Sequence, residues 1–512
     1  MRTLAAVLLA LGFPALAAAQ DGTARAAAAI TPRDIAARIG VIADDSMRGR
    51  ETPSPELDKV AAYIAGEFHR LGLAPGGDAS TFIQRYAIER TQLDTAGSTI
   101  AVRGGPTIKF GADAVTRRGG YAPAGVTGPT VLVSGIAATP DEAARLDVAG
   151  KVVIAVVPTN AAGQPAAAAR TLLAGLARGA PVALLVATSA PDETWTEMVR
   201  LELGTRMDVP WGEGDGPPTV LVRDRALAPV LRRGGINIAA VRRAAAPVVR
   251  ALPGLALTVT VKPRVLEARR APNVVALLEG SDPVLRHEYV VLSAHMDHVG
   301  SAGSGDCPAQ GADSICNGAD DDASGTIAVV ETAEAFAQLS PRPRRSLIFL
   351  TVSGEERGLW GSDYFASHPP VPIGQIVADL NMDMVGRNWK DTIVVIGKEH
   401  SDLGGTLARV SAQHPELHMA AIDDIWPAEG FYFRSDHYNF ARRGVPILFF
   451  FNGTHADYHR PGDEVAKIDA EKESRIVRLV FYLGLELANA AQKPKWNPAS
   501  YRRIVQNSEG RM

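Results

Sequence analysis

The stretch YVVLSAHMDHVG, residues 289–300, contains an apolar strand that runs directly into His295, Asp297 and His298. Its apolar residues do not alternate with polar ones, which is typical of a strand buried on both faces of a parallel sheet. Other apolar runs of this kind follow along the chain and alternate with helical patterns. We therefore expect an α/β fold, with a mostly parallel central sheet covered by helices on both faces.

Polar residues also follow three later strands, which are predicted at 346–352, 376–381 and 446–451. A further polar group precedes the helix predicted over 324–339. These residues are Asp320, Asp321, Asp322, Glu355, Glu356, Asp383, Asp457, Tyr458 and His459. Each group alone could be a helix cap or a solvated charge run. Because ligands bind outside the carboxyl ends of strands in open α/β sheets, their coincidence predicts one functional site at that edge.

The residue types in this site point to metal chemistry. Histidines and carboxylates without a cysteine ligand suit a catalytic zinc site better than a closed structural one. Two zinc ions that share one carboxylate would use five ligands and leave open positions for water. Other catalytic templates are absent, since the sequence contains no H-E-x-x-H, no G-x-S-x-G, no P-loop and no G-x-G-x-x-G motif.

The ordered motifs resemble those of peptidase family M28, the di-zinc aminopeptidase family. They are AHMDHVG (294–300), GADDDASG (318–325), SGEERGLWGS (353–362), LNMDMVG (380–386), RSDHYNF (434–440) and YHRPGD (458–463). The resemblance implies that His295 and Asp383 hold one zinc ion, that Glu356 and His459 hold the other, and that Asp321 bridges them. It also implies a cis peptide bond after Asp321.

The same resemblance implies roles for residues that are not zinc ligands. Glu355 is expected to be the general base and Tyr458 to help bind the oxyanion, while the carboxylate of Asp297 is expected to orient His295. The sequence Ser435-Asp436-His437 is expected to line or support the pocket.

The implied function is a zinc metallopeptidase, an aminopeptidase that hydrolyses N-terminal peptide bonds of peptides or proteins with a free N-terminus. A carboxypeptidase or dipeptidase would use the same fold, a glutaminyl cyclase would hold one zinc ion, and a non-catalytic binding ectodomain would lack ligands or the base. Arg357, Arg387 and Arg434 lie near the site motifs and could bind a substrate carboxylate, although we expect them to form salt bridges.

The composition divides the chain into several predicted parts. Residues 119–250 contain short Val-rich strands, Ala-rich helices and no histidine. We interpret them as a smaller inserted α/β domain, in the position where this family often carries a protease-associated (PA) domain. It separates a first part of the peptidase domain, 31–118, from the catalytic part, 255–490, and residues 491–512 form a C-terminal tail.

Residues 1–19 have the pattern of a signal peptide, with Arg2, an apolar run over Leu4–Leu11 and small residues over Ala15–Ala19. A transmembrane anchor is the alternative, but the apolar run is short for a bilayer. We expect an exported protein, periplasmic or extracellular, without stable membrane insertion after cleavage. The two cysteines, Cys307 and Cys316, are expected to form a disulfide, because a zinc site would need more soft ligands.

The 512 residues are 46% apolar and 21% charged, an ordinary globular balance that excludes a disordered chain, a coiled coil and a multi-spanning membrane protein. Basic residues number 53 and acidic residues 56, so the net charge is −3. This balance gives no reason to expect nucleic acid or an anionic membrane as partner.

Overall fold

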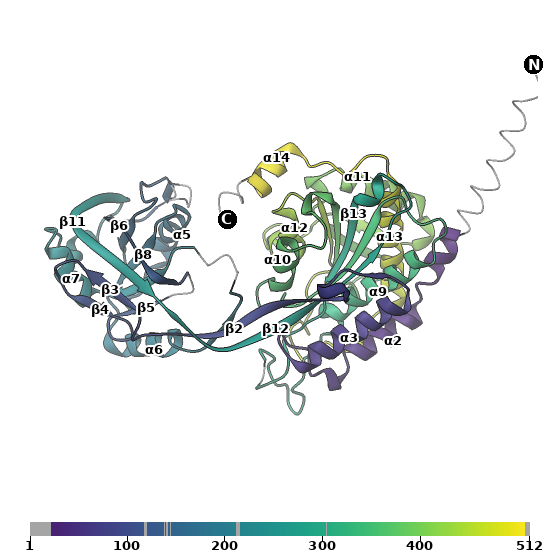
Figure 1. Cartoon of the computed structure of the whole chain (residues 1–512). Coiled ribbons are helices and arrows are strands. Elements are labelled where there is room, and N and C mark those ends of the chain that lie inside the picture. Colours follow the sequence, from purple (N-terminus) through teal and green to yellow (C-terminus); the bar gives the residue numbers. More distant parts are fainter. Residues whose placement is uncertain are drawn as a thin grey trace, which may run out of the picture. The chain divides into compact units, whose positions relative to one another are not determined.

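The structure is a computed structural model that describes residues 22–116, 120–137, 139, 142–143, 145–210, 216–303 and 305–506. These residues form two compact units (Figure 1). Unit 1 contains the described residues of Met1–Ala87 and Arg270–Met512, and unit 2 those of Ile88–Arg269. The signal peptide expected at 1–19 lies outside the described residues, as does the end of the expected tail, 507–512. Every helix in the described part of the chain is too short or too polar to cross a bilayer.

The central sheet of unit 1 is mostly parallel, as the apolar strands predict. Its strands are, in spatial order, β17 (Ala420–Ile422), β16 (Thr392–Ile396), β18 (Ile447–Phe450), β15 (Ile376–Met382), β13 (Tyr289–His295), β14 (Ser346–Val352) and β12 (Pro263–Leu278). The pairs β13–β14, β13–β15, β15–β18 and β16–β17 are parallel, whereas β12–β14 and β16–β18 are antiparallel. The carboxyl ends of β13, β14, β15 and β18 therefore meet at one edge of the sheet.

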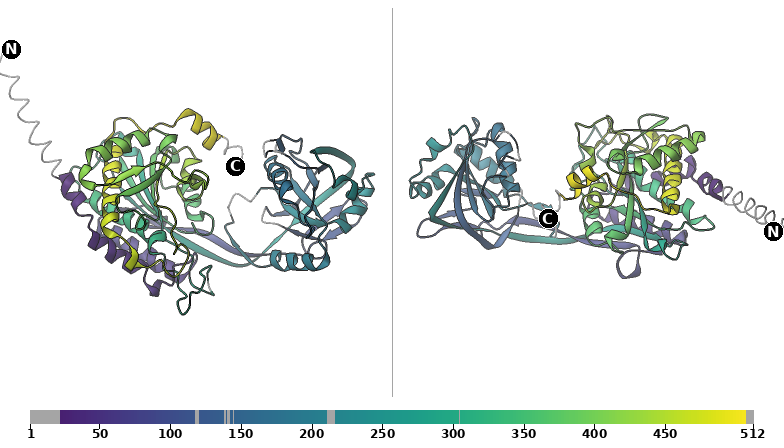
Figure 2. Two further views of the ribbon diagram at one scale, coloured as in Figure 1. Left: turned by 180° about the vertical axis from the view of Figure 1, so that it is seen from behind. Right: turned by 90° about the horizontal axis from the view of Figure 1, so that it is seen from above.

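Helices cover both faces of this sheet (Figures 1 and 2). One face packs against α2 (Pro32–Ile42), α3 (Pro55–Arg70), α9 (Gly325–Ala337), α11 (Leu403–Gln413) and α13 (Ala470–Asn489). The other face packs against α10 (Trp360–Ser367) and α12 (His437–Ala441). In β13, Val290 and Leu292 contact the first group and Val291 the second. This two-sided burial explains why the strand is apolar throughout.

Unit 2 has its own mixed sheet and its own core. The strands are, in spatial order, β4 (Thr107–Lys109), β3 (Thr99–Val102), β11 (Val248–Val261), β6 (Ala122–Ser134), β7 (Val152–Val156), β8 (Ala183–Thr188), β10 (Thr219–Arg223) and β5 (Ala114–Thr116). Its helices are α5 (Arg170–Arg178), α6 (Asp192–Glu202), α7 (Asp224–Arg232) and α8 (Ile238–Val241). Unit 2 is wider than the insertion expected at 119–250, because β3, β4 and β5 pair within its sheet. Its identity as a PA domain stays a prediction.

The chain passes between the units twice, within β2 (Ile83–Leu93) and within β12. These two strands are neighbours in the sheet order, and the short strands β1 (Ala74–Pro75) and β9 (Arg206–Asp208) pair with β12 and β2. At the unit 1 end, the backbone N–H of Val275 donates to the carbonyl oxygen of Phe82 at 2.7 Å. Unit 2 is thus inserted through one pair of adjacent strands.

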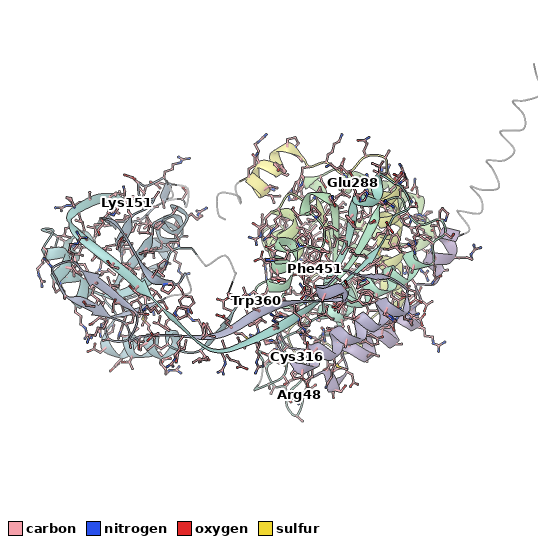
Figure 3. All side chains as sticks on the ribbon, in the orientation of Figure 1. Arg48, Lys151, Glu288, Cys316, Trp360 and Phe451 are labelled. Atoms are coloured by element: carbon pink, nitrogen blue, oxygen red, sulfur yellow. A yellow bond between two sulfur atoms is a disulfide. The ribbon has the colours of Figure 1, made fainter. Side chains whose placement is uncertain are left out.

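A disulfide joins Cys307 to Cys316, as the sequence predicts, and no cysteine in the described residues is free (Figure 3). It closes part of the loop between β13 and the turn before α9. The loop is attached to the N-terminal segment, since the N–H of Cys316 bonds the carbonyl of Gly300, whose own N–H bonds the carbonyl of Gly49. The cysteines are therefore structural and are not metal ligands.

Candidate metal centre

Four strand ends and one turn of unit 1 bring the five expected ligands together. His295 ends β13, Glu356 follows β14, Asp383 follows β15 and His459 lies in the loop after β18, while Asp321 lies in the turn before α9. Their donor atoms form two groups, each with all atoms within 4.8 Å of one another, and Asp321 belongs to both. The expected bridging residue is thus the one that the two groups share.

The first group consists of His295, Asp321 and Asp383, all of them buried. Nε2 of His295 lies 3.3 Å from Oδ1 of Asp321 and 3.7 Å from Oδ1 of Asp383. The hydroxyl of Ser435 donates to the other carboxylate oxygen of Asp383 at 3.0 Å, which orients that carboxylate. One oxygen of each acid is therefore directed at the same histidine nitrogen.

The second group contains Asp321, Glu356 and His459, and also His298, which the motif assignment did not include. Nε2 of His459 lies 3.2 Å from Oδ2 of Asp321 and 3.0 Å from Oε2 of Glu356. Nδ1 of His298 lies 2.9 Å from Oε1 of Glu356 and 3.7 Å from Oδ2 of Asp321. Two histidines three positions apart at the end of one buried strand were the signal that could have identified His298.

Several donor atoms of these groups fit a metal ion because they lack hydrogen-bond partners. Within the described residues, no hydrogen bond engages Oδ2 of Asp321, Oε1 of Glu356, Nε2 of His459 or either ring nitrogen of His298, although all five atoms are buried. Buried polar atoms are almost always partnered in folded proteins. An unpartnered set of histidine nitrogens and carboxylate oxygens is the donor set that zinc uses in catalytic sites.

The turn that carries Asp321 is held by the acids on either side of it. Oδ1 of Asp320 accepts from the N–H of Gly386 at 2.6 Å. Oδ1 of Asp322 accepts from the N–H groups of Gly325 at 2.9 Å and Met384 at 3.1 Å. All three acids of the triplet are buried, so the triplet is not a solvated charge run. The peptide bond between Asp321 and Asp322 is cis, as the resemblance implied.

A buried arginine from the N-terminal segment joins this turn to the end of β13. Arg50 is 0% exposed, and its Nε donates to the carbonyl of Met296 at 2.9 Å. Its Nη2 donates to the carbonyls of Gly318 at 2.5 Å and Asp321 at 3.2 Å, and its Nη1 donates to that of Asn317. Burial lowers the pKa of Arg50, and the acids around it, Asp321 first, act in the opposite direction. No sequence pattern identified this residue.

Glu355 lies beside the two groups and belongs to neither. It lines the same cavity as His295, Asp321 and Asp383. Burial raises the pKa of Glu355 well above its usual value, and the negative charge of Glu356 raises it further, while His295 acts in the opposite direction. Glu355 is therefore placed to exchange a proton next to the ligand groups without being part of them.

The carboxylate of Asp297 makes its closest contacts with the turn before Glu355 and with Thr52 of the N-terminal segment. Its Oδ2 accepts from the N–H of Gly354 at 2.8 Å and from the hydroxyl of Thr52 at 2.8 Å. Nδ1 of His295 lies 3.2 Å from the carbonyl oxygen of Asp297 and 3.6 Å from its Oδ1. Asp297 thus contacts His295 mainly through its backbone carbonyl and contacts the loop of Glu355, the expected base, through its carboxylate.

The cavity at this edge has an empty volume of about 390 Å³. Its polar lining is formed by the first ligand group, Glu355 and Tyr458, and its apolar lining by Met384, Phe431, Phe449 and Phe451, with Arg434, Ser435 and Thr454 completing it (Phe451 is labelled in Figure 3). Burial raises the pKa of Tyr458, so its phenol is protonated at neutral pH. Asp436 and His437 do not line this cavity and are buried behind Ser435.

Comparison with known proteins agrees with this geometry. Residues 273–484 match the model of Peptidase family M28. A "probable zinc metalloprotease" of Leptosphaeria maculans is 26% identical over 265 residues, which are 44% of this chain and 59% of that protein. A "probable leucine aminopeptidase" of Arthroderma benhamiae is 27% identical over 228 residues, 43% of this chain and 58% of that protein. The match thus spans less than two thirds of each relative.

Solved structures are similar over more of the chain. An aminopeptidase from Aneurinibacillus sp. strain AM-1 has a TM-score of 0.48 and 18% identity, with 92% of this chain and 97% of that chain covered. A zinc aminopeptidase from Bacillus subtilis has a TM-score of 0.45 and 15% identity, with coverages of 89% and 94%. The ligand groups at His295–His459 lie inside the segment that matches the family model. This part of the chain, residues 273–484, belongs to peptidase family M28.

Proposed function

We propose that this protein is an exported zinc aminopeptidase, which removes residues from the free N-terminus of peptides or proteins. The observation that carries the proposal is the pair of ligand groups sharing Asp321, with the carboxylate of Glu355 beside them and outside both. Two zinc ions would be held by His295, Asp321, Asp383, Glu356 and His459, with His298 as a further candidate ligand. Zinc bound there would lower the pKa of a water molecule and polarise the substrate carbonyl.

Glu355 is the residue proposed to move the proton. As general base it takes a proton from the attacking water and then gives it to the leaving amine. A raised pKa suits this double task, because a strongly acidic carboxylate could not hold the proton between the two transfers. General acid–base catalysis of this kind typically contributes about 10²–10⁴-fold in rate.

Tyr458 is proposed to stabilise the charge that develops on the carbonyl oxygen. Its protonated phenol can donate a hydrogen bond, and a donor aimed at an oxyanion in a water-poor site is worth more than one in bulk water. Its ring stacks on His459 with 3.9 Å between centroids, which limits the positions that the hydroxyl can adopt. Asp297 acts indirectly, by holding the loop of Glu355 and one nitrogen of His295.

Export and substrate entry are also part of the proposal. The disulfide between Cys307 and Cys316 is compatible with an oxidising compartment such as the periplasm or the cell exterior. The cavity beside the ligand groups is lined in part by Phe431, Phe449 and Phe451, and this apolar lining suits the side chain of a terminal residue.

The test uses the purified protein with aminoacyl-nitroanilides, unblocked peptides and N-acetylated peptides. We expect hydrolysis of the substrates with a free amine only, loss of activity with a chelator, recovery with added zinc, and two zinc ions per chain by elemental analysis. Release of C-terminal residues from acetylated peptides would support a carboxypeptidase instead. A fully active protein with one zinc ion would favour the cyclase-like alternative.

A further inference from the structure

The cavity beside the ligand groups contains a cation that the proposed mechanism does not use. Among the described residues that line it, Arg434 is the only lysine or arginine, whereas the lining acids are Asp321, Glu355 and Asp383. The arginine forms no ion pair with any of these acids among the described residues. Charge compensation within the site therefore does not explain why Arg434 lines this cavity.

The two other arginines near the site motifs are committed to salt bridges, as expected from the sequence. Arg357 pairs with Asp306 at 2.7 Å and with Glu51. Arg387 pairs with Asp457 at 3.0 Å and lies 3.7 Å from Asp463. Both side chains are at most 25% exposed. These arginines stabilise loops, and neither lines the cavity.

Arg434 differs from them in geometry. Its side chain is 53% exposed, and its nearest acid is Glu429, 61% exposed, at 3.5 Å from Nη1. The same Nη1 makes a 3.4 Å hydrogen bond to the carbonyl of Glu429, and no hydrogen bond within the described residues engages Nε or Nη2. Exposed pairs of this kind contribute little to stability, so Glu429 does not explain the position of the arginine.

An aromatic ring contacts the guanidinium of Arg434 and leaves its N–H groups available. The Cζ atom of Arg434 lies over the ring of Phe431, 4.8 Å from its centroid. A cation–π contact of this kind does not use up the N–H donors of a guanidinium. Phe431 itself packs against Phe451 at 4.9 Å between centroids, and both line the cavity. Phe431 thus holds Arg434 at the cavity that both residues line.

We propose that Arg434 binds a carboxylate of the substrate and thereby makes the enzyme selective for peptides that carry a carboxylate close to the scissile bond. A planar guanidinium with free donors recognises carboxylates by paired, charge-assisted hydrogen bonds. The carboxylate is either the C-terminus of a dipeptide or the side chain of an acidic terminal residue. The inference rests on the proposed peptidase function, and it specifies the substrate class within that function.

The test compares two pairs of substrates that differ only in one carboxylate. Leu-Gly is compared with Leu-Gly-amide, and Glu-Gly-amide is compared with Gln-Gly-amide, on the full zinc-loaded protein. In at least one pair we expect the acid to have a kcat/KM about 10- to 100-fold higher than the neutral analogue, mainly through KM, and R434Q to abolish that preference. The first pair reports a C-terminal carboxylate and the second an acidic side chain.

The matched control is E429Q, which removes the weak ion pair and leaves the arginine. It should keep the carboxylate preference, whereas a merely structural pair would give E429Q and R434Q the same phenotype. R434K should keep part of the preference, because lysine retains the charge but not the paired donors. Thermal unfolding of each variant checks that the fold is retained.

A binding measurement gives a readout that does not depend on turnover. Calorimetric titration of the zinc-loaded E355Q protein, in which turnover is slow, should show at least tenfold tighter binding of the preferred acid than of its neutral analogue, and the E355Q/R434Q double variant should bind both equally. The proposal would be overturned if the wild type had no carboxylate preference, if R434Q kept the preference, or if E429Q also removed it. Failure of the wild type to hydrolyse any of the four substrates would overturn the proposed function as well, whereas equal hydrolysis of all four would overturn only the role of Arg434.

Discussion

Nη2 of Arg50 donates a hydrogen bond of 3.2 Å to the carbonyl oxygen of Asp321, the residue that belongs to both ligand groups. The two residues are far apart in sequence, and the bond ties the N-terminal segment to the turn before α9. The same guanidinium bonds the carbonyl of Met296, next to the ligand His295. One buried side chain thus sets the separation of two ligand-bearing segments.

Replacing Arg50 by methionine should therefore weaken both the fold and the metal centre. The change leaves buried carbonyls without donors, at about 1–3 kcal/mol for each unsatisfied group, and removes a positive charge from among buried acids. Thermal unfolding and zinc content after dialysis should both decrease. The exposed Arg48, whose Nη2 donates to the hydroxyl of Ser301 at 3.2 Å, provides the control, and R48M should change stability by less than about 0.5 kcal/mol. A fully zinc-loaded R50M protein with wild-type stability would contradict this role.

Glu355→Gln and Glu356→Gln should have different effects although the residues are adjacent. Glu355→Gln removes a proton acceptor outside both ligand groups, so kcat should fall by about 10²–10⁴-fold while zinc content stays at the wild-type level. Glu356→Gln changes a member of the second group, so zinc content and thermal stability should decrease. Steady-state kinetics with elemental analysis of both proteins checks the difference. If Glu355→Gln loses zinc and recovers full turnover in excess metal, the base has been assigned to the wrong residue.

His298→Gln tests the residue that the motif assignment omitted. Because Nδ1 of His298 lies 2.9 Å from Oε1 of Glu356 within the second group, we expect the variant to lose up to one zinc ion per chain. His455→Gln is the matched control, since Nε2 of His455 lies 3.3 Å from Asp320, outside both groups, and zinc content should be kept. Retention of two zinc ions by His298→Gln would show that this histidine only neighbours the metal centre.

His437 should make the folded state less stable in acid. Burial lowers the pKa of His437 to about 3, whereas histidine in an unfolded chain titrates near 6.5. Between these values the unfolded chain binds the proton and the folded chain does not, so stability is lost as pH falls from about 6.5 toward 3. The loss is at most about 1.4 kcal/mol per pH unit.

The measurement compares wild-type protein with His437→Gln, which cannot take up the proton. Denaturant unfolding at pH 7, 6, 5 and 4 should show the stability difference shifting steadily in favour of the variant as pH falls. Other acid-sensitive groups are common to both proteins and cancel in the difference. A pH-independent difference for His437→Gln would mean that the imidazole is not held neutral in the folded protein.

The sequence was sufficient to predict the parallel sheet and the edge at which the ligands meet. Strands such as β13 are apolar on both faces, so the polar residues directly after them stand out, and Glu356 and Asp383 are found in this way. Arg50 could not be found, because a single arginine in a polar segment has no period and its burial depends on contacts with residues some 250 positions away. His298 was missed because His295, three residues before it, was already assigned as the zinc ligand of this motif.

The limits of unit 2 were also beyond the sequence pattern. The Val-rich composition that marks its centre begins near residue 120, but short strands such as β3 and β5 are assigned by the partners they pair with, β11 and β10. Such pairing between distant segments leaves little trace in local composition. Unit 2, Ile88–Arg269, therefore extends beyond the range that composition marks, 119–250.

The insertion of unit 2 through two adjacent strands has a consequence for how this protein can change during evolution. Because β2 and β12 are hydrogen-bonded where they leave unit 1, a tight turn between them would be enough to close the chain there. The accessory unit can thus be acquired, exchanged or lost through a change at a single point on the surface. The ligand-bearing loops of unit 1 need not move in such an event, so one catalytic architecture can be combined with many different accessory parts.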